Sequence, residues 1–434
     1  MRELRLGVRG IHDHLALPLL PLVQDLGLRG LPFDLGVRQS LVLGLTARIY
    51  ALDATLATAG LSNPSSNKVL ERELLGLGVP LSKRTASGNQ YTVDLDVLGR
   101  IDHHYNASHT PKFPFIPALL ERKRLEKARA NLESLRPCND GRLRTALRST
   151  GTETGRYSSA GLRWCNVCKA ANHGTNLQNI AKNNPELGVN VKDCFVVPSG
   201  YMLWELDYSM LELRIMAYMA GVEKLIARME DPTGDVHTAN THALFDGRYS
   251  DTLRTLAKNF FYALQYGGSE GAIQMALAKK GEYLEQSYIQ GLMLKMFNEY
   301  PQIALWQQRT AKQIETWQKA NEPVIARNAY GGCRVLLSRD PLKEFLSTQI
   351  QGTAAYTMSF VLIRLARLGW DVPLLGQIHD AYLGMSRECD LERDIARVKG
   401  EMERPCMIAD RFVVLPAEVK VGRTWSQLKK VESI

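Results

Sequence analysis

The stretch YMLWELDYSMLELRIMAYMAG, residues 201–221, decides how this chain folds. Its first six residues form a short apolar run that ends at Asp207, and the residues after Ser209 have apolar side chains at helical spacing. This order predicts a strand, an acidic residue and a helix. Taken alone, Asp207 is equally explained as a cap of the helix that follows.

A second acidic residue lies in a predicted hairpin. The segment PLLGQIHDAYLGM (373–385) has two short apolar runs around a polar turn that contains Asp380. Carboxylates are hard oxygen ligands that suit Mg²⁺, and two of them on adjacent strands would hold two ions about 3.5 to 4 Å apart. By itself, Asp380 is also an ordinary turn residue.

The segment RTLAKNFFYALQYGG (254–268) places functional side chains at every fourth position. Four residues turn a helix by roughly 400°, so these side chains lie on one face, in a stripe roughly 18 Å long. Two cations near the helix start suit phosphates, and two aromatic rings suit a base and a sugar. The alternative is a surface helix that packs only at its aromatic end. The stripe consists of Arg254, Lys258, Tyr262 and Tyr266.

Composition limits the class of protein. The 434 residues suggest about three domains, and 45% hydrophobic with 23% charged residues exclude a disordered chain or a coiled coil. The net charge of 54 − 45 = +9 indicates a polyanionic partner. Seven cysteines without a secretory signal favour a reducing compartment, and the uncharged stretch 345–363 is too polar for a bilayer span. We therefore expect a soluble, cytoplasmic protein.

Positive charge is concentrated between residues 121 and 148. This segment has nine basic and four acidic residues, and helical spacing of apolar residues predicts helices over 111–148. It is interpreted either as a solvated helix face or as a surface that follows phosphates. The next segment, 149–200, is rich in loop-forming residues and contains TGTETGRYSS (150–159) and NLQNI (176–180). Arg156 suits a phosphate, and the amides of the second motif suit base edges or sugars.

Together, these stretches resemble the polymerase domain of family A DNA polymerases, the group of bacterial DNA polymerase I and several phage replicases. DYSMLELR (207–214) is similar to motif A of that family, residues 254–267 to motif B, and HDA (379–381) to motif C. Smaller matches follow in the order of the family, from about residue 140 to 425. They are TGR (154–156), NLQN (176–179), DVH (235–237), QGTAA (351–355) and GRTW (422–425).

The resemblance implies an α+β right-hand fold, with an antiparallel palm sheet and helical fingers and thumb. It divides the chain into an N-terminal segment and thumb (1–148), the first part of the palm (149–221), the fingers (222–329) and the second part of the palm (330–434). It implies a DNA-directed DNA polymerase in replication or repair that transfers dNTPs to a DNA primer-template with two Mg²⁺ ions. A processivity factor, a helicase and a separate exonuclease are compatible further partners.

The resemblance also implies a role for each matching residue. Asp207 and Asp380 would ligate the metal ions, and Lys258 would protonate the leaving pyrophosphate. Glu212 would exclude ribonucleotides by a clash at the 2′ position. The residues implied in dNTP binding are Arg254, Lys258, Tyr262, Tyr266, His237 and Glu212. Those implied in primer-template binding are Arg156, Asn176, Gln178, Gln351, His379 and Lys343.

Three positions depart from the family pattern. Ala381 replaces the usual Glu of motif C, which puts the support of the primer end in question. Tyr262 stands where many members have Phe, and in the family this Tyr accompanies acceptance of dideoxynucleotides. Tyr356 replaces the usual Asp after QGTAA, and the sequence offers no explanation for it.

The segment 160–175 is longer than is common in the family. It contains Cys165, Cys168 and His173, which make three of the four ligands that tetrahedral zinc needs. The sequence favours reduced thiols in a loop over a zinc site completed by Cys138 or Cys194.

Only about 110 residues precede the basic helices, and segments 22–34 and 63–98 resemble the junction between exonuclease and thumb. We therefore expect a polymerase without an intrinsic proofreading exonuclease domain. Two alternatives remain open: a non-catalytic DNA-binding protein on a polymerase fold, which Ala381 favours, and a related polymerase that copies RNA or uses ribonucleotides.

Overall fold

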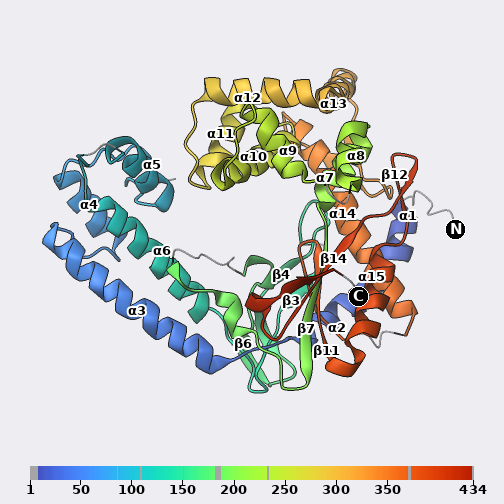
Figure 1. Cartoon of the computed structure of the whole chain (residues 1–434), viewed down its shortest axis with the longest axis horizontal. Coiled ribbons are helices and arrows are strands. Elements are labelled where there is room, and N and C mark those ends of the chain that lie inside the picture. The colour runs from blue at the N-terminus through green and yellow to red at the C-terminus, as the bar shows by residue number, and fades with distance from the viewer. Residues whose placement is uncertain are drawn as a thin grey trace.

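A five-stranded antiparallel sheet forms the centre of the molecule, with strand order β10-β11-β7-β14-β15. A helical arm extends from one side of the sheet, and a layer of helices lies across its upper end (Figure 1). The structure is a computed structural model that describes residues 8–85, 87–107, 110–149, 151–180, 187–231, 234–369 and 373–432. Its mixture of sheet and helix confirms the predicted α+β class.

The central strand of the sheet is the strand predicted before Asp207. Its side chains alternate: Trp204 and Leu206 enter the larger hydrophobic core, whereas Leu203 faces a second core on the opposite side. Asp207 shares the face of Leu203 because side chains two residues apart point the same way. The strands of this sheet are β7 (Tyr201–Tyr208), β10 (Leu374–Ile378), β11 (Ala381–Arg387), β14 (Ala417–Gly422) and β15 (Lys429–Val431).

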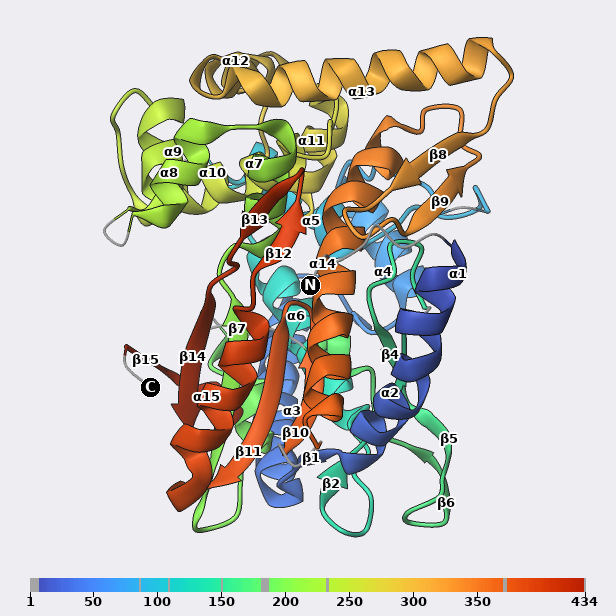
Figure 2. The ribbon, with the colours of Figure 1, turned by 90° about the vertical axis from the view of Figure 1, so that its right-hand side faces the viewer.

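Helices cover the face of the sheet that lies away from Asp207 (Figure 2). The Tyr208 hydroxyl donates to the carbonyl of Met402 at 2.6 Å and thereby ties the sheet to this helical layer. Gly384 is required opposite Trp204, because a Cβ at this glycine would lie 2.0 Å from the indole ring. The helices of this layer are α2 (Leu17–Arg29), α7 (Leu211–Ala220), α14 (Leu342–Arg367) and α15 (Leu391–Met402). α7 confirms the helix predicted after Asp207.

The arm has a hydrophobic core of its own. Arg122 is buried in it and donates to Glu126 at 2.8 Å and to Asp53, so its charge is neutralised inside the arm. By length and composition alone α3 could cross a membrane, but it packs along α6 and carries Arg48, which pairs with Glu121. The helices of the arm are α3 (Leu35–Thr58), α4 (Asn67–Gly76), α5 (Leu95–Tyr105) and α6 (Ile116–Glu133).

The prediction of helices over the whole of 111–148 was correct only for residues 116–133. Pro137 and the turn before Gly141 interrupt the helical pattern, and the chain returns to the sheet as short strands. Arg144 is buried and forms two hydrogen bonds to Asp140 at 2.6 and 2.9 Å. Not all of the basic residues between 121 and 148 therefore contribute to a positively charged surface, because Arg122 and Arg144 are buried in ion pairs. These strands are β2 (Arg142–Leu143), which pairs with β1 (Leu31–Pro32), and β3 (Ala146–Arg148), which pairs with β4 (Ser158–Ala160).

The upper layer confirms the prediction that residues 222–329 are mostly helical. α10 begins at Asp251 as expected, because the Ser250 hydroxyl accepts the backbone N–H of Leu253 at 3.1 Å. The layer consists of α8 (Glu223–Glu230), α9 (Val236–Leu244), α10 (Asp251–Leu264), α11 (Glu270–Ala278), α12 (Gln286–Glu299) and α13 (Pro301–Lys319).

Short elements complete the described chain. The segment 160–175, which the sequence left as a loop, forms a β-hairpin from β5 (Leu162–Cys165) and β6 (Ala170–His173). The other short elements include α1 (Val8–Ile11), β8 (Val324–Arg327), β9 (Cys333–Leu336), β12 (Cys406–Ile408) and β13 (Arg411–Val413). Among the described residues, a π-helical turn (His12–Ala16) and several 3-10 turns lie between the larger elements; the 3-10 turns include Leu177–Asn179, Val191–Cys194, Glu388–Asp390 and Trp425–Gln427.

Candidate active site

Two carboxylates meet where the central strands of the sheet end. Asp207 is the next-to-last residue of β7, and its pairing partner on β11 is Ala381, the residue after Asp380. The backbone N–H of Tyr208 donates to the Asp380 carbonyl at 3.1 Å, which fixes the turn against the end of the strand. The two residues predicted to bind metal, 173 positions apart in sequence, are thus held on neighbouring strands.

The surroundings of both carboxylates disfavour their charged form. Burial raises the pKa of Asp207 to about 6; the carboxylates of Glu205 and Asp380 act in the same direction, while Lys420 opposes them. Burial also raises the pKa of Asp380, although Arg156 and His379 pull it down. A bound divalent cation would relieve both shifts, and carboxylate oxygens are the ligands Mg²⁺ prefers. The chemistry of this donor pair therefore fits a magnesium site.

The turn that carries Asp380 has an unusual backbone. Ile378 pairs with Ala381, so the turn contains only two central residues, and the first of them, His379, has a φ of 53°. Turns of this kind normally place glycine there, and a strained residue of another type is typical of functional sites. The imidazole of His379 is exposed and remains a candidate for primer contact.

Gln178 holds this turn in place. Its side-chain oxygen accepts the backbone N–H of His379 at 2.9 Å, and its amide nitrogen donates to the carbonyl of Gln377 at 2.6 Å. The side chain is buried, and both its oxygen and its nitrogen form hydrogen bonds to the turn. Its predicted contact with DNA stays a prediction, whereas the geometry makes Gln178 a positioning residue for Asp380.

A second network joins the two sides of the site. Glu212 on α7 forms an ion pair with Arg156 and accepts the hydroxyl of Tyr266. Gln351 on α14 donates to the same hydroxyl at 3.2 Å. Arg156 Nη2 also lies 4.0 Å from Asp380 Oδ1. Four of the predicted site residues, from four different segments, are thus brought together beside Asp380.

The α10 stripe faces this network. Tyr262 and Tyr266 both experience the charge of Asp380, which together with burial raises their pKa values, that of Tyr266 to about 12. Tyr266 lies beyond the last residue of α10, next to Gly267 with a φ of 68°. The stripe is therefore helical through Tyr262 and ends in a turn that directs Tyr266 toward Glu212.

The cationic end of the stripe lies beside α9. Arg254 donates to both carboxylate oxygens of Asp235, the shortest contact being 2.9 Å. Burial and the cations Lys258 and Arg254 lower the pKa of His237 to about 4, so its imidazole is neutral near pH 7. Its ring centroid lies 6.3 Å from that of Tyr262. The predicted dNTP residues His237, Arg254, Lys258 and Tyr262 thus share one region.

Two predicted residues lie apart from this cluster. Asn176 accepts the hydroxyl of Ser159 at 2.7 Å, and that hydroxyl in turn accepts the backbone N–H of Gln178. Lys343 is exposed in the first turn of α14, and no contact among the described residues links it to Asp207 or Asp380. Asn176 therefore helps to position Gln178, which holds the turn of Asp380 in place. The role of Lys343 stays a prediction.

Sequence reasoning missed three charged residues of the site. Lys420 on β14 contacts Glu205 at 2.9 Å and Asp207 at 3.5 Å. Its positive charge therefore partly neutralises both carboxylates. The alternation of β7 places Glu205 and Asp207 on one face, which was the available signal. Asp235 lies in the noted DVH motif, but its pairing with Arg254 depends on tertiary structure.

Tyr356, for which the sequence offered no explanation, packs against two glycines. A Cβ at Gly155 would lie 3.2 Å from the Tyr356 ring, and a Cβ at Gly332 would lie 2.7 Å from it. Gly155 immediately precedes Arg156 and has a φ of 78°. The ring therefore supports the loop that presents Arg156.

The fold, with its paired carboxylates beside a cationic helix, defines a class of protein with a right-hand architecture. A model of the family described as DNA polymerase family A matches residues 44–427. The chain therefore belongs to DNA polymerase family A, whose members catalyse with divalent metal ions. This confirms the family and the fold class expected from the sequence.

Curated relatives support this assignment, and a solved structure supports the fold. DNA polymerase I, thermostable, of Thermus caldophilus is 27% identical and covers 95% of this chain and 48% of its own length. DNA polymerase I of Chloroflexus aurantiacus is 26% identical, over 96% of this chain and 44% of its own. The chain thus spans about half the length of these relatives. The POL domain of Pol1 from M. smegmatis, in complex with DNA primer-template and dNTP, has a TM-score of 0.77 at 24% identity and covers 95% of this chain and 70% of that one.

Proposed function

We propose that the chain is a template-directed DNA polymerase that adds dNTPs to the 3′-hydroxyl of a DNA primer. The observation that carries this proposal is the meeting of Asp207 and Asp380 beside the α10 stripe, within a family A fold. Relatives named DNA polymerase I and a neighbour solved with primer-template and dNTP support the same substrates.

In this proposal Asp207 and Asp380 hold two Mg²⁺ ions. When bound, such ions lower the pKa of the attacking hydroxyl and neutralise the charge of the triphosphate. Lys258 and Arg254 bind the triphosphate, and Lys258 donates a proton to the leaving pyrophosphate. The neutral imidazole of His237 donates a hydrogen bond rather than a charge to the same phosphates.

The residues around Glu212 select the sugar and gate the template. Glu212 excludes a ribose by a clash with its 2′-hydroxyl, and the ion pair with Arg156 neutralises the charge of Glu212. Tyr266 occupies the base-pair pocket and leaves it when a template base enters, at the cost of its hydrogen bonds to Glu212 and from Gln351. Tyr262 lies against the incoming sugar and base.

The arm, the upper helical layer and the sheet unit then correspond to the thumb, fingers and palm of the right-hand fold. The arm lies within the proposed thumb and N-terminal segment (1–148), the upper layer corresponds to the fingers (222–329), and the sheet unit combines palm segments 149–221 and 330–434. Exposed cations on α6, such as Arg124 and Lys127, would follow the phosphates of the duplex. By analogy with the bacterial relatives, we place the protein in the cytoplasm of a bacterial or phage-infected cell.

One observation favours a second candidate, a DNA-binding protein without catalysis. Ala381, which replaces the usual motif C Glu, is buried directly opposite Asp207. Retention of both metal-binding carboxylates and of Lys258 supports catalysis instead.

Primer extension tests the proposed function. Purified protein is incubated with Mg²⁺ and a labelled primer on DNA or RNA templates, with dNTPs or rNTPs. We expect templated extension with dNTPs on DNA. Binding of primer-template without extension by any nucleotide would favour the non-catalytic protein, and efficient extension on RNA would favour the RNA-copying alternative.

Tyr262 predicts sensitivity to chain terminators. The phenol hydroxyl is the only group that distinguishes Tyr262 from Phe, and in the proposed site it takes the place of a missing 3′-hydroxyl. We therefore expect dideoxynucleotides to stop extension at a low ratio to dNTPs, and Tyr262→Phe to raise the required ratio by about 10²-fold or more, the typical effect of losing one well-placed polar contact. Single-nucleotide incorporation with ddNTP and dNTP measures the ratio. Unchanged discrimination in Tyr262→Phe would refute the placement of this residue, and Tyr288→Phe, an exposed tyrosine on α12, serves as the control.

A further inference from the structure

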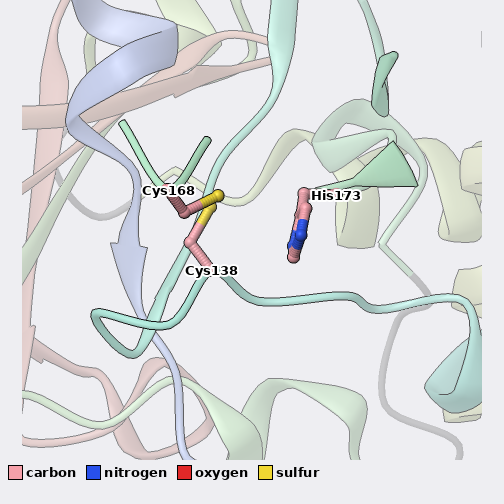
Figure 3. Close-up of side chains that lie close together, drawn as sticks. All are labelled: Cys138, Cys168 and His173. Atoms are coloured by element: carbon pink, nitrogen blue, oxygen red, sulfur yellow. The ribbon is translucent and has the colours of Figure 1, made fainter. Parts of the chain in front are cut away.

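Four potential zinc ligands converge at the base of the arm, remote in sequence from motifs A, B and C. The ligand atoms of Cys138, Cys168 and His173 all lie within 4.8 Å of one another. Figure 3 shows the two sulfurs beside each other with the imidazole next to them. A fourth ligand atom, the sulfur of Cys165, lies 3.5 Å from that of Cys138. Tetrahedral zinc with Zn–S bonds of about 2.3 Å requires sulfurs about 3.8 Å apart, so the spacing of the Cys138 and Cys165 sulfurs is close to that of two ligands of one ion.

The β5–β6 hairpin shapes half of this cluster. Cys165 is the last residue of β5, and Cys168 lies in the turn that follows. The backbone N–H groups of Val167 and Cys168 hydrogen bond to the Cys165 sulfur. Lys169, with a φ of 54°, closes the turn. Two cysteines separated by two residues, with backbone N–H groups directed at the first sulfur, form a turn that presents both sulfurs to one point.

Segment 134–141 supplies the third sulfur. Cys138 is 4% exposed and Cys165 is fully buried, so both sulfurs lie beneath the surface. The backbone N–H of Cys138 donates to the carbonyl of Arg142 at 2.9 Å, and that of Gly174 donates to the carbonyl of Arg136 at 2.7 Å. The first bond closes the turn of segment 134–141, and the second fixes the segment against the end of the hairpin independently of any ligand.

His173 has the tautomer that a zinc ligand requires. Its Nδ1 lies 3.1 Å from the carbonyl oxygen of Pro137. A carbonyl only accepts, so Nδ1 carries the proton, and in the neutral ring the lone pair is left on Nε2. Histidine ligands of zinc commonly donate their second nitrogen to a backbone carbonyl in this way.

We propose that Cys138, Cys165, Cys168 and His173 bind one structural Zn²⁺ ion. Three thiolates and an imidazole select zinc over Mg²⁺, because soft ligands disfavour the harder ion. A disulfide between Cys138 and Cys165 would leave Cys168 and the orientation of His173 unexplained. The sequence favoured reduced thiols because only three ligands are local; the fold brings in Cys138 as the fourth.

The ion would join the arm to the sheet unit. α6 ends at residue 133, and the chain passes Cys138 before entering β2. The hairpin has little apolar support of its own, since Trp164 and Val167 are 55% and 50% exposed. Zinc, and not hydrophobic packing, would thus hold the hairpin to the base of the arm.

Metal analysis of the full chain, purified with a reductant and without chelators, tests the site. We expect about one zinc per chain in the wild type and less than about a tenth of that in Cys168→Ser and in His173→Ala, since a structural site needs all four ligands. Cys333→Ser and Cys389→Ser, which change exposed cysteines elsewhere, are matched controls that should retain the zinc.

A second measurement does not depend on folded variants. Wild-type protein stripped of metal and loaded with Co²⁺ should show the absorption of a tetrahedral thiolate site, and thiol reagents should reach Cys168 only after stripping. No stoichiometric zinc in wild-type protein and no cobalt spectrum would overturn the proposal, as would full zinc content in both ligand variants. Because neither readout uses polymerase activity, failure of this proposal is distinguishable from failure of the proposed function.

Discussion

Asp207→Asn is expected to lower the rate of dNTP incorporation by at least about 10³-fold, equivalent to about 4 kcal/mol of transition-state stabilisation. The substitution keeps the shape of the side chain but removes the negative charge that would hold the divalent cation. Asp380→Asn should have a similar effect, because Asp380 is proposed to bind the same ions and its charge acts on Asp207. Rapid-quench incorporation of a single dNTP under saturating primer-template measures the change.

The same substitution should stabilise the metal-free protein. The pKa of Asp207 is raised to about 6 in the folded state, so ionisation is easier in the unfolded chain and the charged form costs folding free energy. Stability from this group is fully present below about pH 4 and is lost as the pH rises through about 6. We therefore expect Asp207→Asn to unfold at a higher temperature than the wild type at pH 7.5, with the difference gone near pH 4. The side chain is 41% exposed, which keeps the effect modest.

Loss of activity together with a gain in stability would separate a catalytic role from a folding role. Asp246→Asn is a suitable control, because this carboxylate is 71% exposed and pairs with Lys295 away from the site. Near wild-type incorporation by Asp207→Asn would refute the catalytic assignment, and a loss of activity in the Asp246 control would reveal an unspecific effect of charge.

The sequence predicted the parts of the site whose chemistry is encoded locally. The apolar run 201–206 predicts the strand that ends at Asp207, and helical spacing places Arg254, Lys258 and Tyr262 on one face of α10. The polar turn at 379–380 follows from the apolar runs around it. In each case a short segment is sufficient, because neighbours in sequence are neighbours in space.

Contacts between residues that are far apart in sequence were not predicted. Gln178 clamps a turn about 200 residues away, and Lys420 reaches Asp207 across a strand pair that no local pattern specifies. Cys138 lies 27 residues from Cys165, so the sequence alone could not decide whether Cys138 or Cys194 completes the proposed zinc site. Helix prediction failed after residue 133 because a turn around Gly141, and not the periodicity of the apolar residues, directs the chain there.

Lys258→Ala is expected to lower kcat/KM for dNTP incorporation by about 10²- to 10³-fold, the typical effect of removing one group that stabilises developing charge. It should have a larger effect than Arg254→Ala, although both cations belong to the same stripe. Arg254 already forms charge-assisted hydrogen bonds to Asp235. Burial raises the pKa of Asp235, but hydrogen bonds from Thr238 and Arg254 outweigh it and lower the pKa to about 2, so this pair persists across the physiological pH range.

Lys258 is exposed on the same helix, and no ion-pair partner for it is present among the described residues. Its full charge is therefore available to the triphosphate, whereas Arg254 would first have to leave Asp235. Lys258→Arg should keep most of the binding but lose part of kcat, because a guanidinium does not release its proton to the leaving pyrophosphate. Steady-state kinetics with a single dNTP separate the two effects.

The comparison includes Lys280→Ala, in which a lysine that donates to Asn259 at 2.7 Å is removed from the adjacent part of the same layer. This control should retain wild-type kinetics. An Arg254→Ala loss equal to or larger than that of Lys258→Ala would contradict the argument, because it would show that the ion pair with Asp235 does not reduce the share of Arg254 in binding the triphosphate. Asp235→Asn provides the complementary check, since release of Arg254 should then lower KM while kcat stays governed by Lys258.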